Sequence, residues 1–204
     1  MAREKRAAYA GETYWGQPLP GFGDPGARIV VFGLAPAAHG ANRTGRFFTG
    51  DRSGDFLFAA LYRAGLSDRA LSRSKDDGLR LSGLWISAAV RCAPPQNKPT
   101  PEERDACLPY AARELDLLDA KVIVCLGAFA WDAALRLFGI KPKPKFGHGA
   151  EAAADALVLL GCYHPSQQNT FTGVLKPEML DAVLLRAKEL AEEGAAEEGA
   201  DPVG

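Results

Sequence analysis

Between residues 28 and 66 the chain reads RIVVFGLAPAAHGANRTGRFFTGDRSGDFLFAALYRAGL. The apolar run at 28–32 leads into a long loop rich in glycine, and the apolar side chains of 56–66 then recur at helical spacing. This order predicts a strand, a loop and a helix. Such a loop lies at the carboxyl end of a strand, where open α/β sheets build their ligand sites. A loop of this length without regular structure is more often functional than a plain connection.

The rest of the chain repeats the same alternation of strand and helix. Apolar runs predict strands at 28–34, 84–90, 121–127 and 156–162, and helical periodicity predicts helices at 55–64, 101–118, 128–138 and 176–193. Buried strands that alternate with amphipathic helices indicate a parallel sheet covered on both faces. We therefore expect a three-layer α/β/α sandwich with a central four-stranded parallel sheet. Residues 1–27 are assigned to a helix remnant and lead-in, 28–193 to the main domain, and 194–204 to an acidic flexible tail.

The charge of the chain is unevenly distributed. The 204 residues carry a net charge of −1, but the last sixteen hold six acidic residues and no basic one, so residues 1–188 have a net charge of +5. A mildly basic body is compatible with DNA binding. An ordinary solvated surface with a frayed terminus explains the same charges. Because the sequence has neither a long apolar segment nor an apolar signal core, we expect a cytoplasmic protein that does not bind membranes.

A second loop has the same placement as the first, because the run 156–162 ends in YHPSQQNTF at 163–171. Together with GLAPA at 33–37 and NRTGR at 42–46, it resembles the signature pair of the uracil-DNA glycosylase superfamily. The first loop is similar to that of the type b, or family 5, branch. YWG at 14–16, GFGDP at 21–25 and AVRCAPPQNKP at 89–99 extend the resemblance. It implies an enzyme that flips uracil out of DNA and hydrolyses the N-glycosidic bond, leaving an abasic site.

The resemblance also assigns roles in the reaction. Phe48 occupies the position that stacks against the flipped base, and a π-face suits any base. His164 is placed to donate a hydrogen bond as negative charge develops on the leaving base. Ala35 is apolar where much of the superfamily carries a carboxylate or an amide that activates water. This departure is typical of family 5, and it leaves Asn42 to orient the water in a largely dissociative mechanism.

Recognition of the base is expected to be loose. We place the Asn97 amide at the base edge, because one amide offers both a donor and an acceptor; a plain turn residue before Lys98-Pro99 is the other reading. His39 is a further candidate for contact with substrate or phosphate. Other branches carry an asparagine near Ala88, where this chain is apolar. We therefore expect excision of hypoxanthine besides uracil.

The partner is expected to be DNA that contains uracil or another deaminated base, bound by a monomer. Positive side chains and amide or hydroxyl groups position a duplex through its phosphates. Residues 167–171 also provide side chains that could fill the gap left by the flipped base. The candidates for contact with DNA are Arg43, Arg46, Arg52, Lys98, Lys176, Ser166, Gln168 and Asn169.

The four cysteines fall into two pairs. Cys125 and Cys162 lie in apolar runs and are expected to be small core residues. Cys92 and Cys107 resemble two of the four ligands of the [4Fe-4S] cluster in type b enzymes, whose other two ligands come from an N-terminal Cys-x-x-Cys. Two thiolates cannot complete such a site. Either an N-terminal segment precedes this sequence, which the retained spacing favours, or the cluster has been lost; as given, the chain is expected to bind a cluster poorly or not at all.

Two other interpretations stay open. A doubly wound protein could hold a nucleotide phosphate in its glycine-rich loop, although this loop lacks a compact G-x-G-x-x-G run. A damage-binding module without activity would explain the apolar Leu34-Ala35 pair and the missing cluster ligands. Activity on a uracil-containing oligonucleotide separates these interpretations from a glycosylase.

Overall fold

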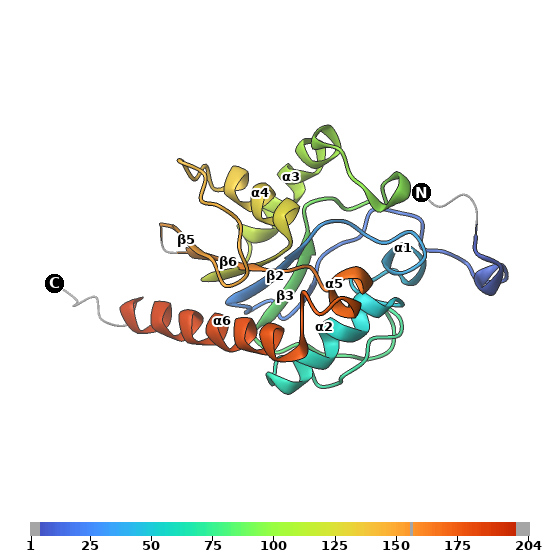
Figure 1. Ribbon diagram of the computed structural model, residues 1–204, viewed down its shortest axis with the longest axis horizontal. Coiled ribbons are helices and arrows are strands. Elements are labelled where there is room, and N and C mark those ends of the chain that lie inside the picture. The colour runs from blue at the N-terminus through green and yellow to red at the C-terminus, as the bar shows by residue number, and fades with distance from the viewer. Residues whose placement is uncertain (1–4, 156, 199–204) are drawn as a thin grey trace.

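Four parallel strands form the centre of the structure, a computed structural model that describes residues 5–155 and 157–198 (Figure 1). The strand at residues 122–126 shows why these strands lie at the centre. All five of its residues are buried, so it is covered on both faces, as a central parallel strand must be. The parallel strands lie in the order β3-β2-β4-β6, which confirms the predicted sheet. Their bounds are β2 (Ile29–Gly33), β3 (Leu84–Ala88), β4 (Val122–Leu126) and β6 (Leu157–Cys162).

Two antiparallel edge strands extend this sheet beyond the prediction. β1 (Phe22–Gly23) pairs with β3, and β5 (Glu151–Ala154) pairs with β6. Neither gives a clear signal in the sequence, because β1 has two residues within a Pro/Gly-rich segment and β5 consists of one glutamate and three alanines. The sheet therefore has six strands. Residue 156, the first of the predicted fourth strand, lies outside the described residues.

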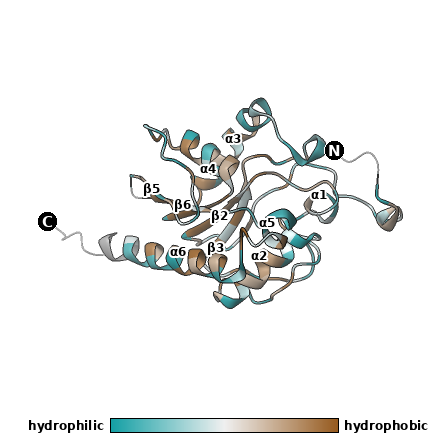
Figure 2. Cartoon of the chain, viewed as in Figure 1, coloured by the Kyte–Doolittle hydropathy of each residue, from teal (hydrophilic) through white to brown (hydrophobic). Residues whose placement is uncertain are grey.

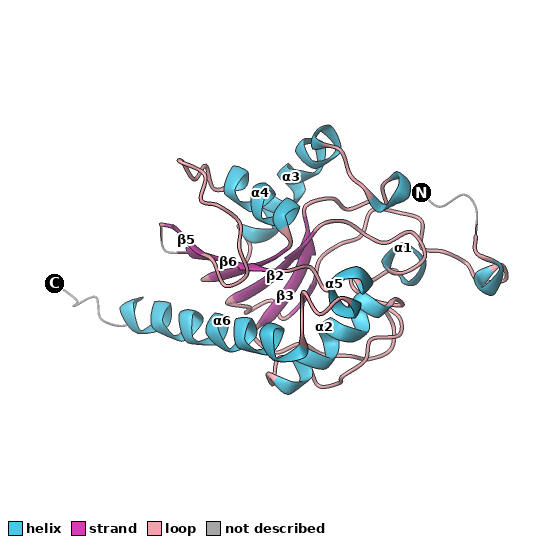
Figure 3. Cartoon of the chain, in the orientation of Figure 1, coloured by secondary structure: helices cyan, strands magenta, loops and turns pink. Residues whose placement is uncertain are grey.

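Helices cover both faces of the sheet, as Figure 3 shows. The four long ones are α2 (Arg52–Arg63), α3 (Pro101–Leu115), α4 (Ala128–Leu137) and α6 (Pro177–Glu198). The shorter ones are α1 (Ala41–Thr44), α5 (Gln167–Phe171) and the 3₁₀ turns η1 (Ala7–Tyr9) and η2 (Pro95–Asn97). Thr100 starts α3 with a capping box, since its side chain accepts a hydrogen bond from the Glu103 amide while the Glu103 carboxylate accepts one from the Thr100 amide.

The boundaries of three segments differ from those assigned from the sequence. α2 begins three residues earlier than predicted, with Asp51 as its N-cap. Within the described part of 1–27 the helical structure is the single turn η1, and Phe22–Gly23 joins the sheet. α6 continues past residue 193 to Glu198, and residues 199–204 of the predicted tail lie outside the described residues.

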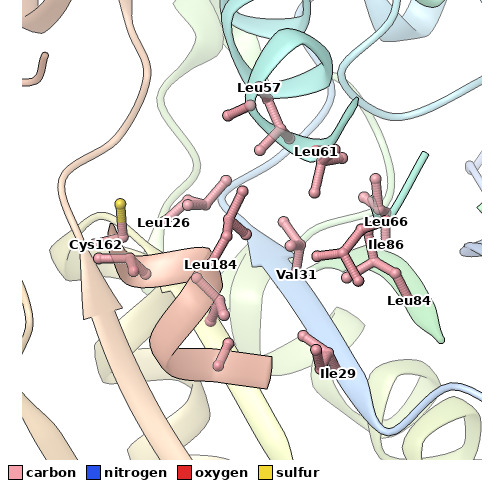
Figure 4. Close-up of a cluster of buried hydrophobic side chains, with 14 of the residues drawn as sticks. Ile29, Val31, Leu57, Leu61, Leu66, Leu84, Ile86, Leu126, Cys162 and Leu184 are labelled. Atoms are coloured by element: carbon pink, nitrogen blue, oxygen red, sulfur yellow. The ribbon is translucent and has the colours of Figure 1, made fainter. Parts of the chain in front are cut away.

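The core has two halves, one on each face of the sheet. Ile29 and Val31 point from β2 toward α2 and α6, where they meet Leu57 and Leu184 (Figure 4). Intervening residues point the other way and pack beneath α3 and α4. In Figure 2 the strands between the two helical layers have mainly the hydrophobic colour. The period of two in side-chain direction thus separates the two halves. Cys125 and Cys162 are fully buried in this core, as expected.

The topology fixes the edge at which a ligand site can form. The chain runs from β2 to β3 on one side and reaches β4 and β6 on the other, so the strand order changes direction beside β2. Ligands of open α/β sheets bind at the carboxyl ends of strands at such a point. The loops after β2, β3 and β6 meet there. Among the described helices, none is both long and apolar enough to cross a membrane.

Candidate functional site

A small cavity of about 60 Å³ lies at the carboxyl ends of β2, β3 and β6. Backbone and apolar side chains of the loop after β2 form most of its wall, together with Ala88 at the end of β3. The polar side chains that line it are Asp51, Ser53 and His164. The cavity therefore joins both loops that the sequence singled out, in the place expected for the site.

Phe48 forms one side of this cavity. Its ring centroid lies 6.3 Å from that of His164, and its backbone has a positive φ of 51°. A side chain on Gly33 would come within 2.9 Å of the Phe48 ring, so glycine at this strand end lets the ring lie across the sheet edge. Phe47 also lines the cavity, but it belongs to the core and has 1% of its surface exposed. The two phenylalanines thus differ in burial, since Phe47 is part of the core and Phe48 is half-buried.

His164 also lines the cavity, and its main chain is firmly held. The His164 carbonyl accepts hydrogen bonds from the Ser166 amide and from Asn169 Nδ2, both at 2.8 Å. Gly127 lies against the imidazole, because a Cβ there would be 3.3 Å from His164 Cβ. No hydrogen bond joins the ring nitrogens to any described residue, so they remain available to a ligand. Burial lowers the pKa of His164 to about 4, so that the imidazole is neutral at neutral pH.

The cavity wall is apolar at the two positions where the sequence predicted it. Ala35 and Ala88 both line the cavity, and neither can activate water or pair with a base edge. Asn42 does not line the cavity. Its Nδ2 donates to the Ala38 carbonyl at 3.3 Å, while its buried Oδ1 has no protein hydrogen-bond partner within the described chain. This acceptor is buried and does not belong to the cavity wall, so the structure does not bring Asn42 into the space where a ligand would lie.

His39 and Asn97 brace the loop after β2 and do not line the cavity. The Tyr14 hydroxyl lies 2.9 Å from His39 Nδ1, and Asn97 Oδ1 accepts a hydrogen bond from the Ala38 amide at 2.9 Å. Asn97 adopts a positive φ of 56° in η2, which turns its side chain back toward this loop. Asn97 thus links the turn before Lys98-Pro99 to the loop after β2, which is close to the structural role given above as the alternative. Its placement at the base edge stays a prediction.

Arg43 and Arg46 of the first loop make hydrogen bonds and ion pairs within the protein. Arg46 is buried, and its guanidinium donates to Asp77 Oδ1 at 2.7 Å and to Ser72 Oγ at 2.8 Å. This corrects the expectation that Arg46 reaches DNA phosphate, because a buried and paired guanidinium cannot do so. Arg43 pairs with Glu12 at 2.6 Å and donates to the carbonyl of His39. It also lies over the Tyr9 ring at 4.2 Å, so most of its donors are already used.

The other candidates for contact with DNA remain at the surface around the cavity. Arg52 and Lys176 line a hollow of about 540 Å³ together with Phe171, whose side chain is exposed. Lys98 and Gln168 are also exposed. Ser166 caps α5 by accepting from the Asn169 amide at 3.3 Å, so Ser166 and Asn169 also shape the loop that holds His164. Arg52 and Lys176 therefore lie beside α5, the helix that follows His164 in the chain.

Cys92 and Cys107 lie close together on the β3–α3 segment. Burial raises the pKa of Cys92, and the neighbouring Cys107 thiol adds to this effect. In the described part of the chain no three His, Cys, Asp or Glu side chains group in a way that could hold a metal ion. Two thiols do not fit the four-ligand set of a [4Fe-4S] cluster. The described residues therefore do not provide a site for that group, and no step of the chemistry below depends on it.

Asp51 is the cavity residue that the sequence reasoning missed. Its side chain caps α2 by accepting from the Gly54 amide at 3.0 Å, and it also lines the cavity. The predicted helix began at residue 55, so Asp51 was left in the loop without a role. The signal was present, because aspartate is one of the preferred N-cap residues directly before a helical run.

Comparison with known proteins gives a consistent result. Residues 20–188 match the model of the family described as the uracil DNA glycosylase superfamily. A type-5 uracil-DNA glycosylase of Mycobacterium tuberculosis is 57% identical over 196 residues, which cover 94% of this chain and 73% of that protein. One from Thermus thermophilus is 54% identical over 190 residues, or 92% of this chain and 86% of that protein. A type-4 uracil-DNA glycosylase of Archaeoglobus fulgidus is 34% identical over 155 residues, covering 72% of this chain and 70% of its own.

Proposed function

The chain belongs to the uracil DNA glycosylase superfamily, and we propose that it excises uracil from DNA by hydrolysing the N-glycosidic bond. One observation carries the proposal: Phe48 and His164 line the same cavity at the carboxyl ends of the parallel strands, with their ring centroids 6.3 Å apart. An aromatic face and a hydrogen-bond donor are what a flipped base requires, since the first stacks on the ring and the second stabilises its departing charge.

The first step is heterolysis of the bond between the sugar C1′ and the base. The electron pair leaves with the base, and the neutral His164 imidazole donates its single N–H to the developing oxyanion. A low pKa suits this role, because a neutral imidazole keeps its proton while it polarises the base. The sugar is left with positive charge, and a water molecule then adds to C1′. Asn42 is the residue predicted to orient that water, but it does not line the cavity, so this role stays a prediction.

DNA is bound through the surface that surrounds the cavity. Arg52, Lys98 and Lys176 are exposed there and can contact phosphates on either side of the flipped nucleotide. Gln168 on α5 lies next to the segment that carries His164, so α5 is placed to fill the gap in the duplex. Such contacts hold the backbone and do not read the sequence of the DNA. The protein should therefore act on damage in any sequence context.

The pocket should accept more than one deaminated base. Ala35 and Ala88 leave the cavity wall without an amide that could pair with the base edge. A site that rejects an analogue strongly needs buried polar groups that the wrong base leaves unpaired. Without them, hypoxanthine should be excised besides uracil.

Alkali cleavage of an end-labelled duplex tests this proposal. The duplex carries a single U opposite G, with T in place of U as the control substrate and inosine as the alternative one. Wild-type protein should convert the U strand to an alkali-labile abasic site and leave the T strand intact. His164→Ala should lose this activity while it still binds the U duplex. Binding of the U duplex by wild-type protein without cleavage would instead support a damage-binding module.

A further inference from the structure

His39 lies at the rim of the cavity, in the turn between Ala37 and Ala41, which both line the cavity wall. The imidazole itself is half-buried and does not line the cavity. A nucleotide whose base enters this cavity keeps its phosphates outside, at the rim. A side chain in this position can therefore meet the DNA backbone and not the base.

The two ring nitrogens of His39 differ in their partners. The Tyr14 hydroxyl lies 2.9 Å from Nδ1, and the two rings meet edge to face, with their centroids 6.0 Å apart and an angle of 83° between their planes. Within the described part of the chain no hydrogen bond reaches Nε2, and this atom is not buried. One nitrogen is thus held by the protein and the other is open to a ligand.

Tyr14 is held in place by the main chain that follows it. The amides of Trp15 and Gly16 donate to the carbonyls of Arg43 and Asn42 on α1, both at 3.2 Å. These bonds place the phenol beside the turn that carries the imidazole, because that turn leads directly into α1. The contact between the two rings therefore rests on a fixed main-chain arrangement.

The direction of this hydrogen bond decides what the open nitrogen can do. The phenol has one proton, and the acceptor that it meets among the described residues is Nδ1 of His39. When a hydroxyl donates to Nδ1, the proton of a neutral imidazole lies on Nε2. The open nitrogen is then a hydrogen-bond donor.

The charges around this donor favour an anion. The Lys5 ammonium lies 5.5 Å from the centre of the Tyr14 ring, and Arg43 Nε donates to the His39 carbonyl at 2.9 Å. Glu12 pairs with Arg43 at 2.6 Å, and its carbonyl accepts a hydrogen bond from Lys5 at 2.5 Å. Two cations and one carboxylate leave this group with a positive charge. A phosphate oxygen is the anionic acceptor that the DNA backbone offers.

We propose that Tyr14 holds His39 with its Nε2–H directed outward, and that this N–H donates to a phosphate oxygen beside the flipped nucleotide. This inference rests on the proposed glycosylase function. His39 is then a DNA-binding residue, and Tyr14 is a positioning residue that acts through it. A neutral donor releases no counterion, so this contact should depend little on salt, unlike contacts of Arg52 or Lys176.

Paired replacements separate the roles of the two nitrogens. Glutamine carries an amide N–H near the position of Nε2 and asparagine carries one near Nδ1, so His39→Gln keeps the outward donor and His39→Asn loses it. Tyr14→Phe removes the hydroxyl and keeps the ring. Tyr9→Phe is its matched control, because the Tyr9 ring packs under Arg43 and its hydroxyl has no hydrogen-bond partner among the described residues.

Binding is measured on a duplex with a non-cleavable 2′-fluoro-deoxyuridine, so that the contact is read apart from the chemical step. The phosphate on each side of this nucleotide is either intact or replaced by an uncharged methylphosphonate. The tautomer of His39 is read by NMR of nitrogen-labelled protein in mildly alkaline buffer. The melting temperature of each variant shows whether it is folded.

We expect His39→Asn to weaken binding about tenfold and Tyr14→Phe about threefold, as for the loss or misalignment of one charge-assisted hydrogen bond, while His39→Gln and Tyr9→Phe stay within about twofold of wild type. One of the two methylphosphonates should weaken binding by wild type and not by His39→Asn, which has already lost the contact. The wild-type spectrum should show the proton of His39 on Nε2. A merely structural role would not make the effect depend on one phosphate.

A folded His39→Asn that binds like wild type would overturn the assignment, and so would a wild-type spectrum with the proton on Nδ1. Equal effects of each methylphosphonate on wild type and His39→Asn would overturn it as well. If Tyr14→Phe does not fold, the two His39 variants still decide the phosphate contact and the spectrum decides the tautomer. All these results leave the proposed function intact, whereas a wild-type protein that binds the duplex and leaves a normal deoxyuridine uncleaved would overturn that function.

Discussion

Replacing Arg46 by methionine tests whether its guanidinium stabilises the folded protein or contacts DNA. Arg46 is 5% exposed and donates to Asp77 at 2.7 Å and to Ser72 at 2.8 Å. Ser72 in turn bonds the Thr49 hydroxyl at 2.7 Å, next to Phe48. Removal of Arg46 therefore breaks an interior connection between the first loop and the segment before β3.

The size of the effect follows from the state of Asp77. Burial opposes its ionisation, but hydrogen bonds from the Arg73 amide, the Arg46 guanidinium and the amides of Leu79 and Ser74 bring its pKa from 3.8 to about 2. At about 1.36 kcal/mol for each tenfold change in proton affinity, this lowering corresponds to about 2.4 kcal/mol shared among the donors. The lost hydrogen bond to Ser72 adds about 1 kcal/mol. We expect Arg46→Met to lower the free energy of unfolding by about 2–3 kcal/mol, since the backbone donors to Asp77 remain.

Urea unfolding and a salt series of DNA binding measure both roles in one set of variants. Arg52→Met is the matched control, because Arg52 is exposed beside the cavity. Arg46→Met should lose stability and keep the wild-type slope of log K against log salt concentration. Arg52→Met should stay within about 0.5 kcal/mol of wild type and reduce that slope by about one. The opposite result for Arg46, a smaller slope with unchanged stability, would refute the interior placement.

Three further predictions concern the cavity. His164→Ala should slow excision by about 100-fold or more because it removes the donor to the leaving base, measured in single turnover with binding as the control. Phe47→Ala should cost about 3–5 kcal/mol in urea unfolding as a core truncation, whereas Phe48→Ala should cost less stability and lose excision; equal stability losses would contradict the division of the two rings. Because folding lowers the pKa of His164 from 6.5 to about 4, the unfolded chain binds the proton first as pH falls, so stability should decrease between about pH 6.5 and pH 4, by about 3 kcal/mol at most. His164→Ala should flatten unfolding free energy over this window.

The sequence predicts the parallel sheet well because its signals are local. β4 is a continuous apolar run bounded by Lys121 and Gly127, and Thr100-Pro101 marks the start of α3 within one residue. The edge strand β5 has no such signal, since its alternation consists of one glutamate and small alanines. Its existence depends on pairing with β6, which no local pattern encodes.

The site is harder to predict because its residues acquire roles from distant partners. The loop position of Arg46 is visible in the sequence, but Asp77, which holds it inside, is 31 residues away in a segment without regular structure. Asn97 meets the Ala38 amide across 59 residues. Resemblance identified Phe48 and His164, because their motifs are contiguous. It could not identify Asp51 as a cavity residue, because that position depends on the path of the cavity wall.

Burial explains both ionisation states in the cavity, and this links its chemistry to its expected breadth. Low solvation lowers the pKa of His164 and raises that of Asp51, so the empty cavity disfavours charge on either group. In the proposed reaction, bond cleavage creates an anionic base beside the neutral His164 imidazole, in a cavity that solvates charge poorly. We therefore expect the rate of excision to depend on how well the site stabilises the separated charges, and less on hydrogen bonds to the base edge. For bases that fit beside Phe48, the rate of excision should then follow the stability of the departing anion, and a base that leaves as a poor anion should be excised slowly even when it binds well.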